Sequence, residues 1–228
     1  MKNQPETSRF NHSSGSLFVL STRSTGIIAA VSVGLAAVAR PYGSRMSNGG
    51  LLVSVGALQC CWLGANLAIS FLEAPVKFLA PTPARRSLID VGRHVFSALN
   101  KVEVVLAVFD LLGWYLLTQR SFDTRIPLPF ATVIADMTRG SPPGLWKQLG
   151  MGWRQWIRFT PGVVVLALQS FGFLPAMRNL GTRFIEGLPT EHNNKVHGIY
   201  VMLEAIKIVA LSVSTASIAK TLMALCSN

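Results

Sequence analysis

Residues 196–217 read VHGIYVMLEAIKIVALSVSTAS, an apolar stretch that is long enough to cross a bilayer and carries Glu204 and Lys207 near its middle. Residues 96–117 read FSALNKVEVVLAVFDLLGWYLL and carry Glu103 in the same way. A membrane-spanning helix needs about 20 apolar residues, and a charge at its centre costs roughly 2.5–3.5 kcal/mol on insertion scales. Such charges face a partner helix or a polar cavity, so the two stretches predict a membrane protein with a polar seam.

The overall composition agrees with this prediction. Of the 228 residues, 50% are hydrophobic and 14% are charged, whereas a soluble domain carries about 25% charged residues. The formal net charge is +11. Because the Lys and Arg residues lie mostly between the apolar stretches, they are placed to meet anionic lipid headgroups. The composition therefore indicates a lipid bilayer as the partner and argues against nucleic acid.

Two further apolar stretches complete a set of four predicted spans. These spans cover about 51–73, 96–117, 159–177 and 196–217. They fill a domain of residues 51–225, so the predicted fold is an all-α, polytopic membrane four-helix bundle with an N-terminal extension. Pro75 follows the first span, where it should end or kink the helix, and Pro175 lies near the end of the third.

Small residues recur every four positions in the first span. They are Gly56, Cys60, Gly64 and Ala68. Small side chains on one helix face let a second backbone approach closely, which predicts that this face is a packing seam.

Residues 1–50 form the N-terminal extension. Its one apolar stretch, residues 26–39, is too short for a comfortable span and is followed by Arg40-Pro41. The segment is rich in Ser and Thr and poor in acidic residues. It is therefore either a targeting segment, such as a signal or organellar transit peptide, or an extra helix. A mitochondrial or plastid membrane is one location that this pattern predicts.

The connector before the third span contains an aromatic and basic segment, residues 145–158. Trp146, Trp153 and Trp156 lie there among Lys and Arg residues. Tryptophan next to cations is typical of an amphipathic helix in the headgroup layer. We expect this segment at the membrane interface.

The two halves of the chain share a short pattern. Ser70-Phe71-x-x-x-Pro75 matches Ser170-Phe171-x-x-x-Pro175, and a span with an embedded glutamate follows each proline at nearly the same separation. The pattern predicts two repeated two-helix hairpins with an axis along the membrane normal. Such symmetry would bring Glu103 and Glu204 together near the centre of the bundle.

The embedded polar residues of the second and fourth spans lie at helical spacing. The predicted central polar cluster consists of Asn100, Glu103, Asp110, Tyr200, Glu204 and Lys207. Within each span these residues are separated by three, four or seven positions, so they share a helix face. The cluster is either a structural clamp that holds helices together, or a path or pocket for a proton, an ion or a small solute.

Motifs for ordinary catalysis do not occur. The sequence has no nucleophile elbow, Walker loop, HExxH or dinucleotide fingerprint, so no catalytic residue and no cofactor are predicted. His94 and His197 lie near the loop ends of the second and fourth spans. They leave one alternative, a membrane redox protein in which the two histidines ligate haem or a metal.

The leading expectation is a non-enzymatic membrane protein. It would be either a small transporter or channel-like protein, or an accessory subunit of a membrane complex, and a homo-oligomer fits both.

Two places in the sequence also point to a family. Residues 70–78, SFLEAPVKF, are followed by residues 91–96, VGRHVF, and residues 196–200 read VHGIY. In these stretches the chain resembles the transmembrane protein 205-like family of small four-helix integral membrane proteins. The resemblance covers about residues 51–220. It implies four membrane helices and no established catalytic activity.

Overall fold

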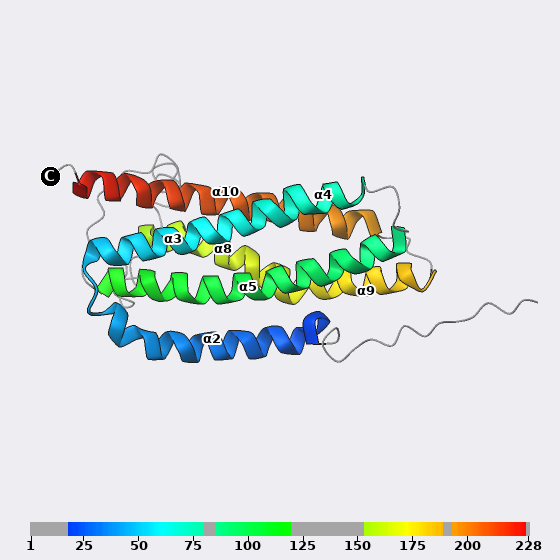
Figure 1. The fold of residues 1–228 in the computed structure, drawn as a ribbon, viewed down its shortest axis with the longest axis horizontal. Helices are drawn as coiled ribbons and strands as arrows, with labels where there is room; N and C mark the ends of the chain where they lie inside the picture. Colours follow the sequence, from blue (N-terminus) through cyan, green and yellow to red (C-terminus); the bar gives the residue numbers. More distant parts are fainter. Residues whose placement is uncertain (1–17, 80–84, 120–152, 189–192, 227–228) are drawn as a thin grey trace, which may run out of the picture.

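The computed structural model describes residues 18–79, 85–119, 153–188 and 193–226 (Figure 1). Within these ranges the chain is helical and forms no strand. In chain order, the helical elements are α2 (Thr22–Gly43), α3 (Asn48–Asn66), η1 (Leu67–Glu73), α4 (Ala74–Lys77), α5 (Arg85–Gln119), α8 (Trp153–Leu168), η2 (Gln169–Phe173), α9 (Leu174–Ile185) and α10 (Asn193–Cys226).

The helices run lengthwise beside one another, which confirms the predicted all-α bundle (Figure 1). The unit α3–η1–α4 forms one continuous helix, and so does α8–η2–α9. Helix α5 lies at the centre of the contacts, against α2, α3, α8 and α9, and α10 packs on α3 and α8. Helix α2 lies at one edge of the bundle, along α5.

Four helices of the described chain are long and apolar enough to cross a membrane. They span Thr22–Gly43, Asn48–Lys77, Pro161–Ile185 and Lys195–Met223. These four helices indicate a multi-pass integral membrane protein. Helix α5, which contains the predicted span 96–117, is also long enough, but Lys101, Glu103 and Asp110 lower its hydropathy. The helices that surround α5 separate these charged side chains from lipid.

The stretch expected to be too short for a span, residues 26–39, is part of α2. The helix has 22 residues because it also includes Thr22–Thr25 at its start and Arg40–Gly43 at its end. Ser21 caps it by accepting a hydrogen bond from the backbone N–H of Arg23. The stretch therefore forms the extra helix, which was one of the two alternatives that the sequence left open, and the targeting role stays a prediction.

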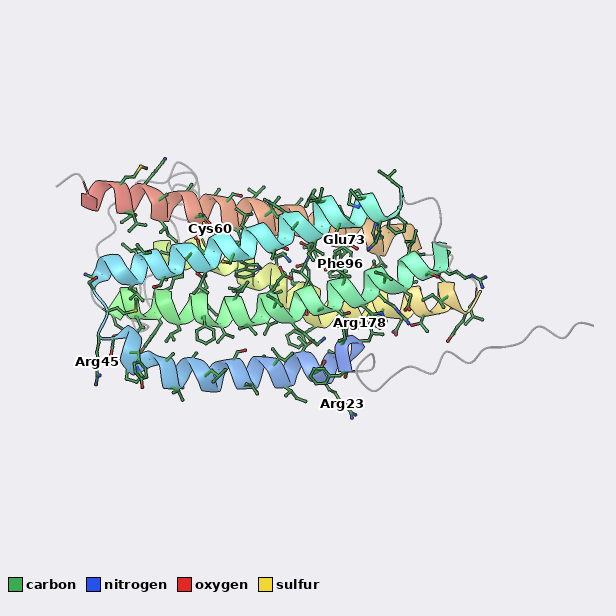
Figure 2. All side chains as sticks on the ribbon, viewed as in Figure 1. Arg23, Arg45, Cys60, Glu73, Phe96 and Arg178 are labelled. Carbon is green, nitrogen blue, oxygen red and sulfur yellow. The ribbon has the colours of Figure 1, made fainter. Side chains whose placement is uncertain are left out.

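Helix α2 has the inverted polarity of a membrane helix. Its small and polar side chains, such as Thr25, Ser32 and Ala36, are buried. Its large apolar side chains are exposed: Ile27, Val31, Val33, Leu35 and Val38. Arg23 at its start and Arg45 beyond its end lie at opposite ends of the helix (Figure 2). This arrangement presents an apolar surface to lipid between two positively charged ends.

The helices do not end at Pro75 or at Pro175, because a π-helical turn precedes each proline. In η1 the N–H of Ala74 bonds to the carbonyl of Ile69, and in η2 the N–H of Leu174 bonds to the carbonyl of Gln169. Proline normally clashes with the carbonyl four residues before it. The wider π turn moves that carbonyl aside, so both helices continue.

The predicted packing seam of the first span holds only at Gly56, which is half-buried and where an added Cβ would lie 3.2 Å from Ile218 of α10. Cys60, Gly64 and Ala68 are exposed on the outer face of α3 and η1. The opposite face is buried and carries Gln59 and Trp62. The interfacial segment predicted at residues 145–158 lies mostly outside the described residues.

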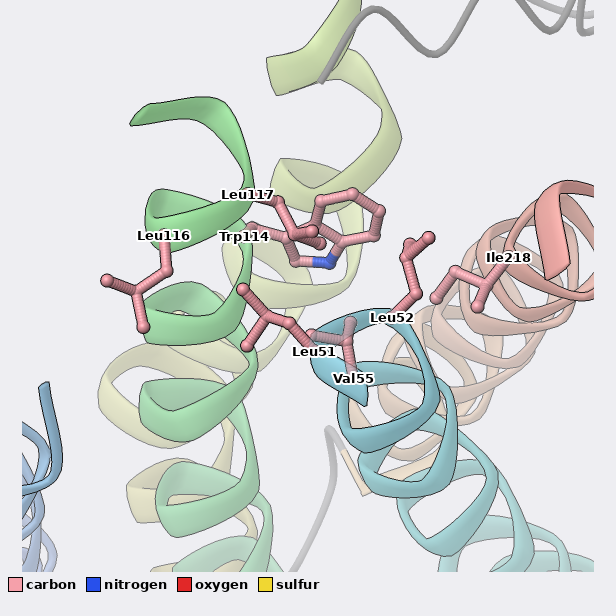
Figure 3. Close-up of a cluster of buried hydrophobic side chains, with 7 residues drawn as sticks. All are labelled: Leu51, Leu52, Val55, Trp114, Leu116, Leu117 and Ile218. Atoms are coloured by element: carbon pink, nitrogen blue, oxygen red, sulfur yellow. The ribbon is translucent and has the colours of Figure 1, made fainter. Parts of the chain in front are cut away.

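One hydrophobic cluster closes an end of the bundle, where α3, α5 and α10 meet (Figure 3). Its buried side chains are Leu51, Leu52, Val55, Trp114, Leu116, Leu117 and Ile218. A second cluster lies nearer the middle and consists of Trp62, Val104, Ala107, Leu166 and Leu211. The polar residues discussed below lie next to this second cluster.

Gly113 of α5 is a tight point of the first cluster. A Cβ atom at Gly113 would collide with the Cγ2 atom of Val55 on α3. We expect Gly113→Ala to destabilise the protein by about 1–3 kcal/mol through overpacking, measured as unfolding of the purified protein in detergent. Adding Val55→Ala should recover most of the loss. Gly64→Ala is the control, because nothing lies within 4 Å of its added Cβ. Equal stability of the Gly113 and Gly64 variants would contradict the prediction.

Candidate functional site

Three charged side chains meet in the middle of the bundle, between α5 and α10. The Nζ atom of Lys207 lies 2.5 Å from Oε1 of Glu103 and 3.1 Å from Oε1 of Glu204. Glu204 and Lys207 are three residues apart on α10, so they share a face. Glu103 reaches them from α5. We call Glu103, Glu204 and Lys207 the central triad; their exposed fractions are 1%, 2% and 0%.

Neutral donors from both interrupted helices complete the site. In η2, the Gln169 amide donates to Oε1 of Glu204 at 3.0 Å and accepts from Lys207 Nζ at 2.9 Å. In η1, the Ser70 hydroxyl lies 3.5 Å from Oε2 of Glu204 and donates to it. Each π-helical turn therefore supplies one residue that contacts the triad: η1 supplies Ser70 and η2 supplies Gln169.

Two aromatic residues border the triad. The indole Nε1 of Trp62 in α3 donates to Oε1 of Glu103 at 2.9 Å. Tyr200 lies one turn before Glu204 on α10 and interacts with its carboxylate. The ring of Phe96 meets the Tyr200 ring edge to face, with centroids 6.0 Å apart.

The charge balance of the triad is unequal. Two carboxylates face one ammonium group, and every other described hydrogen-bond partner is neutral. An uncompensated charge costs several kcal/mol in a buried site. One additional proton or one monovalent cation would balance it, so the triad has the chemistry of a site that can take up and release a single positive charge.

The structure divides the predicted cluster into parts. Glu103, Tyr200, Glu204 and Lys207 come together as expected. Asn100 lies about one turn before Glu103 on α5. Its amide donates to the Ser170 hydroxyl at 2.8 Å, and Ser170 directly follows Gln169, which contacts the triad. Asp110 forms a separate buried pair, since its Oδ1 accepts from the Gln59 amide of α3 at 3.1 Å.

The sequence did not identify five partners of these residues: Gln59, Trp62, Gln169, Ser70 and Ser170. A signal for two of them exists in the first span, where Gln59, Trp62 and Asn66 are separated by three and four residues. That spacing places polar and aromatic groups on one helix face. Gln169 precedes the Ser170-Phe171 pattern and carries no comparable signal.

The two histidines lie away from the triad. His94 Nδ1 is 2.8 Å from the carbonyl oxygen of Asp90 on the same helix, and His197 is exposed at the start of α10. Among the described residues, no group of three or more His, Cys, Asp or Glu side chains is arranged to hold a metal ion. Two-histidine ligation of haem would not need such a group, and it stays a prediction.

Comparisons with known proteins add no relative. No family model, no curated protein and no solved structure matches the chain. The resemblance to the transmembrane protein 205-like family therefore stays a prediction that is carried by the sequence stretches quoted above.

Proposed function

We propose that the protein is a small transporter or channel-like membrane protein whose central triad carries a proton or a monovalent cation. One observation carries the proposal: two fully buried carboxylates share one lysine at the centre of a membrane-type bundle. Ionisable groups at this depth are costly, and proton relays are a main use of them.

The geometry of the triad suits an exchange of partners. Lys207 is within 4 Å of both Glu103 and Glu204. When one carboxylate takes a proton, the ammonium group keeps the other as its counter-ion. Gln169 contacts both Lys207 and Glu204, so it can support either pairing. The site then changes its charge without leaving a bare ion in the bundle.

The π-helical turns provide elements that can move. Lys207 and Gln169 have no exposed surface, so carriage across the bundle needs a change of packing. Both η1 and η2 contact the triad, through Ser70 and Gln169. Shifting a helix register by one residue rotates the following segment by roughly 100°, and π turns are frequent at functional sites. We assign the opening movement to these two turns.

The predicted repeat fits this assignment. Ser70 of the first half contacts Glu204 in the second half, while Asn100 of the first half contacts Ser170 of the second. Each serine thus reaches the second helix of the other half. We propose that η1 and η2 are equivalent parts of two repeated hairpins and that the triad lies near their common axis.

Proton flux into vesicles tests the proposal. The full chain is reconstituted into liposomes, a potassium gradient with valinomycin sets the potential, and a pH-sensitive dye reports proton entry. We expect flux above that of empty liposomes, and at least a tenfold loss for Glu103→Gln and for Glu204→Gln. Sodium and potassium entry are measured in parallel as the cation alternative.

The control is Lys220→Gln, which removes an exposed cation from the same helix as the triad and should leave flux unchanged. Each variant is checked for monodispersity and thermal stability before reconstitution. If the cluster only holds the helices together, the expected result differs. The wild-type chain then gives no flux above empty liposomes, or the wild type and both glutamate variants give equal flux. Either result would reject the transport proposal.

A further inference from the structure

Two buried cations lie together near the N-terminal end of α2, and one of them, Lys101, precedes Glu103 of the central triad by two residues on α5 and so lies on another face of that helix. Lys101 of α5 and Arg178 of α9 have exposed fractions of 7% and 8%. Arg178 lies between the main bundle and the start of α2, where Arg23 projects outward (Figure 2). No acidic side chain of the described chain pairs with Lys101 or Arg178.

Among the residues that the structure describes, the hydrogen-bond partners of these two cations are neutral oxygens. Lys101 Nζ donates to the carbonyls of Val19 and Ser97, at 2.5 and 3.4 Å. Arg178 Nε donates to the Ser97 hydroxyl at 2.9 Å, and Nη1 to the Thr22 hydroxyl at 3.3 Å. Because both cations contact Ser97, their charges lie close enough to repel each other. The Nη2 atom of Arg178 is buried without a hydrogen-bond partner.

Two other cations of the described bundle, Lys207 and Arg93, do have counter-ions. Lys207 has two glutamates, and Arg93, which also contacts α9, lies 2.6 Å from Asp90. A buried charge without a partner is strongly unfavourable. The Lys101 ammonium group has three N–H donors, of which two make the contacts with backbone carbonyls. Both N–H donors of Arg178 Nη2 make no hydrogen bond. The unused donors therefore require an acceptor, and the adjacent positive charges favour an anionic one.

The start of α2 adds to the positive field. Its first turn contains no acidic residue, so no negatively charged side chain there compensates the positive end of the helix dipole. The guanidinium group of Arg178 is directed at this turn through Thr22. Three positive elements thus converge on one place: Lys101, Arg178 and the helix terminus.

The length of α2 gives the depth of this place in a bilayer. A helix of 22 residues is about 33 Å long, close to the roughly 30 Å of a hydrocarbon core. With α2 across the membrane, Thr22 lies at one boundary, at the level of lipid phosphates. Helices α5 and α9 extend past this end of α2 (Figure 1).

We propose that Lys101 and Arg178 form a binding site for a phosphate group at this boundary, provided by the headgroup of an anionic lipid. Phosphate oxygens accept from the free Nη2 of Arg178 and from the ammonium group of Lys101, as in other charge-assisted pairs. The lipid chains lie along the exposed apolar face of α2, and the bound lipid holds α2 against α5 and α9. Free phosphate has the same oxygen chemistry, so the test includes it.

Lipid titration of the purified full chain in a neutral detergent tests the site. Dioleoylphosphatidylglycerol, dioleoylphosphatidylcholine and inorganic phosphate are added separately, and thermal unfolding and native mass spectrometry report binding. We expect phosphatidylglycerol to raise the melting temperature and to remain bound, and phosphatidylcholine to do so at least tenfold more weakly. Equal stabilisation by inorganic phosphate would instead assign the site to free phosphate.

Variants locate the binding. Lys101→Gln and Arg178→Gln should each weaken phosphatidylglycerol binding at least tenfold, whereas Arg183→Gln, an exposed cation on the same helix as Arg178, should not. If Arg178→Gln does not fold, Arg178→Lys keeps the charge and should retain the preference for phosphatidylglycerol with lower affinity. The proposal is overturned if the wild type does not prefer phosphatidylglycerol or phosphate, or if the glutamine variants bind as tightly as the Arg183 variant.

Discussion

Lys207→Met is expected to destabilise the protein by about 3–5 kcal/mol, the usual cost of removing one partner from a buried ion pair. Lys207 is fully buried, and its ammonium group contacts Glu103, Glu204 and Gln169. Methionine has a similar length but carries no charge. The variant would therefore leave two carboxylates in the bundle centre without a counter-ion. The measurement is the free energy of unfolding in mixed micelles, with Lys220→Met as the exposed control on the same helix.

A compensated variant separates charge from packing. Glu103→Gln and Glu204→Gln added to Lys207→Met remove all three charges while keeping side chains of similar size. Replacing a complete buried ion group by neutral residues is often nearly neutral for stability, so most of the loss should be recovered. A loss for Lys207→Met that does not exceed that of Lys220→Met would contradict the buried triad.

The central charges were predictable from the sequence because their cost in lipid is large. Helical spacing places Glu204 and Lys207 on one face. Because Glu103 must be shielded from lipid, the arrangement of lowest free energy packs its helix against that face. The neutral partners were not predictable in the same way. Gln169 and Trp62 are uncharged, so each costs less in a span than a charged side chain does, and their partners depend on which helix faces which.

The face of the first span was predicted wrongly for a physical reason. Gly64 and Cys60 can face lipid at no cost, since lipid chains and a helix surface are similarly apolar. Gln59 and Trp62 carry polar hydrogens that need an acceptor, and an unpaired polar group in hydrocarbon is costly. In a membrane helix the hydrogen-bonding face therefore decides the packing before the small residues do.

Helix α2 and the two prolines show the limits of counting apolar residues. Thr25 and Ser32 shorten the apolar run, yet both are buried against the bundle and do not interrupt the span. Pro75 and Pro175 would end an ordinary α-helix. The π-helical turns that accommodate them depend on hydrogen bonds across five residues, which the local sequence does not specify.

Trp62→Ala is expected to have the other large effect on stability. Trp62 is 1% exposed and packs in one cluster with Val104, Leu166 and Leu211. Tryptophan-to-alanine changes in soluble cores cost about 3–5 kcal/mol through lost transfer and a residual cavity. In a membrane the unfolded helices stay in lipid. The contribution from transfer of the side chain out of water is therefore smaller, whereas the contribution from the cavity remains. We therefore expect a loss of about 3 kcal/mol, at the low end of that range.

Trp62→Phe distinguishes packing from hydrogen bonding at the same position. Phenylalanine keeps most of the volume but removes the N–H that donates to Glu103, and Glu103 retains Lys207 as a partner. The expected loss is about 1 kcal/mol, the typical net value of one hydrogen bond. Leu67→Ala, at an exposed apolar position of η1, is the control for a change in apolar surface. Unfolding in mixed micelles should rank the losses as Trp62→Ala, then Trp62→Phe, then Leu67→Ala. If the phenylalanine variant lost as much as the alanine variant, the bond to Glu103 would outweigh the packing of the indole. Trp62 would then belong to the triad and not to the hydrophobic cluster.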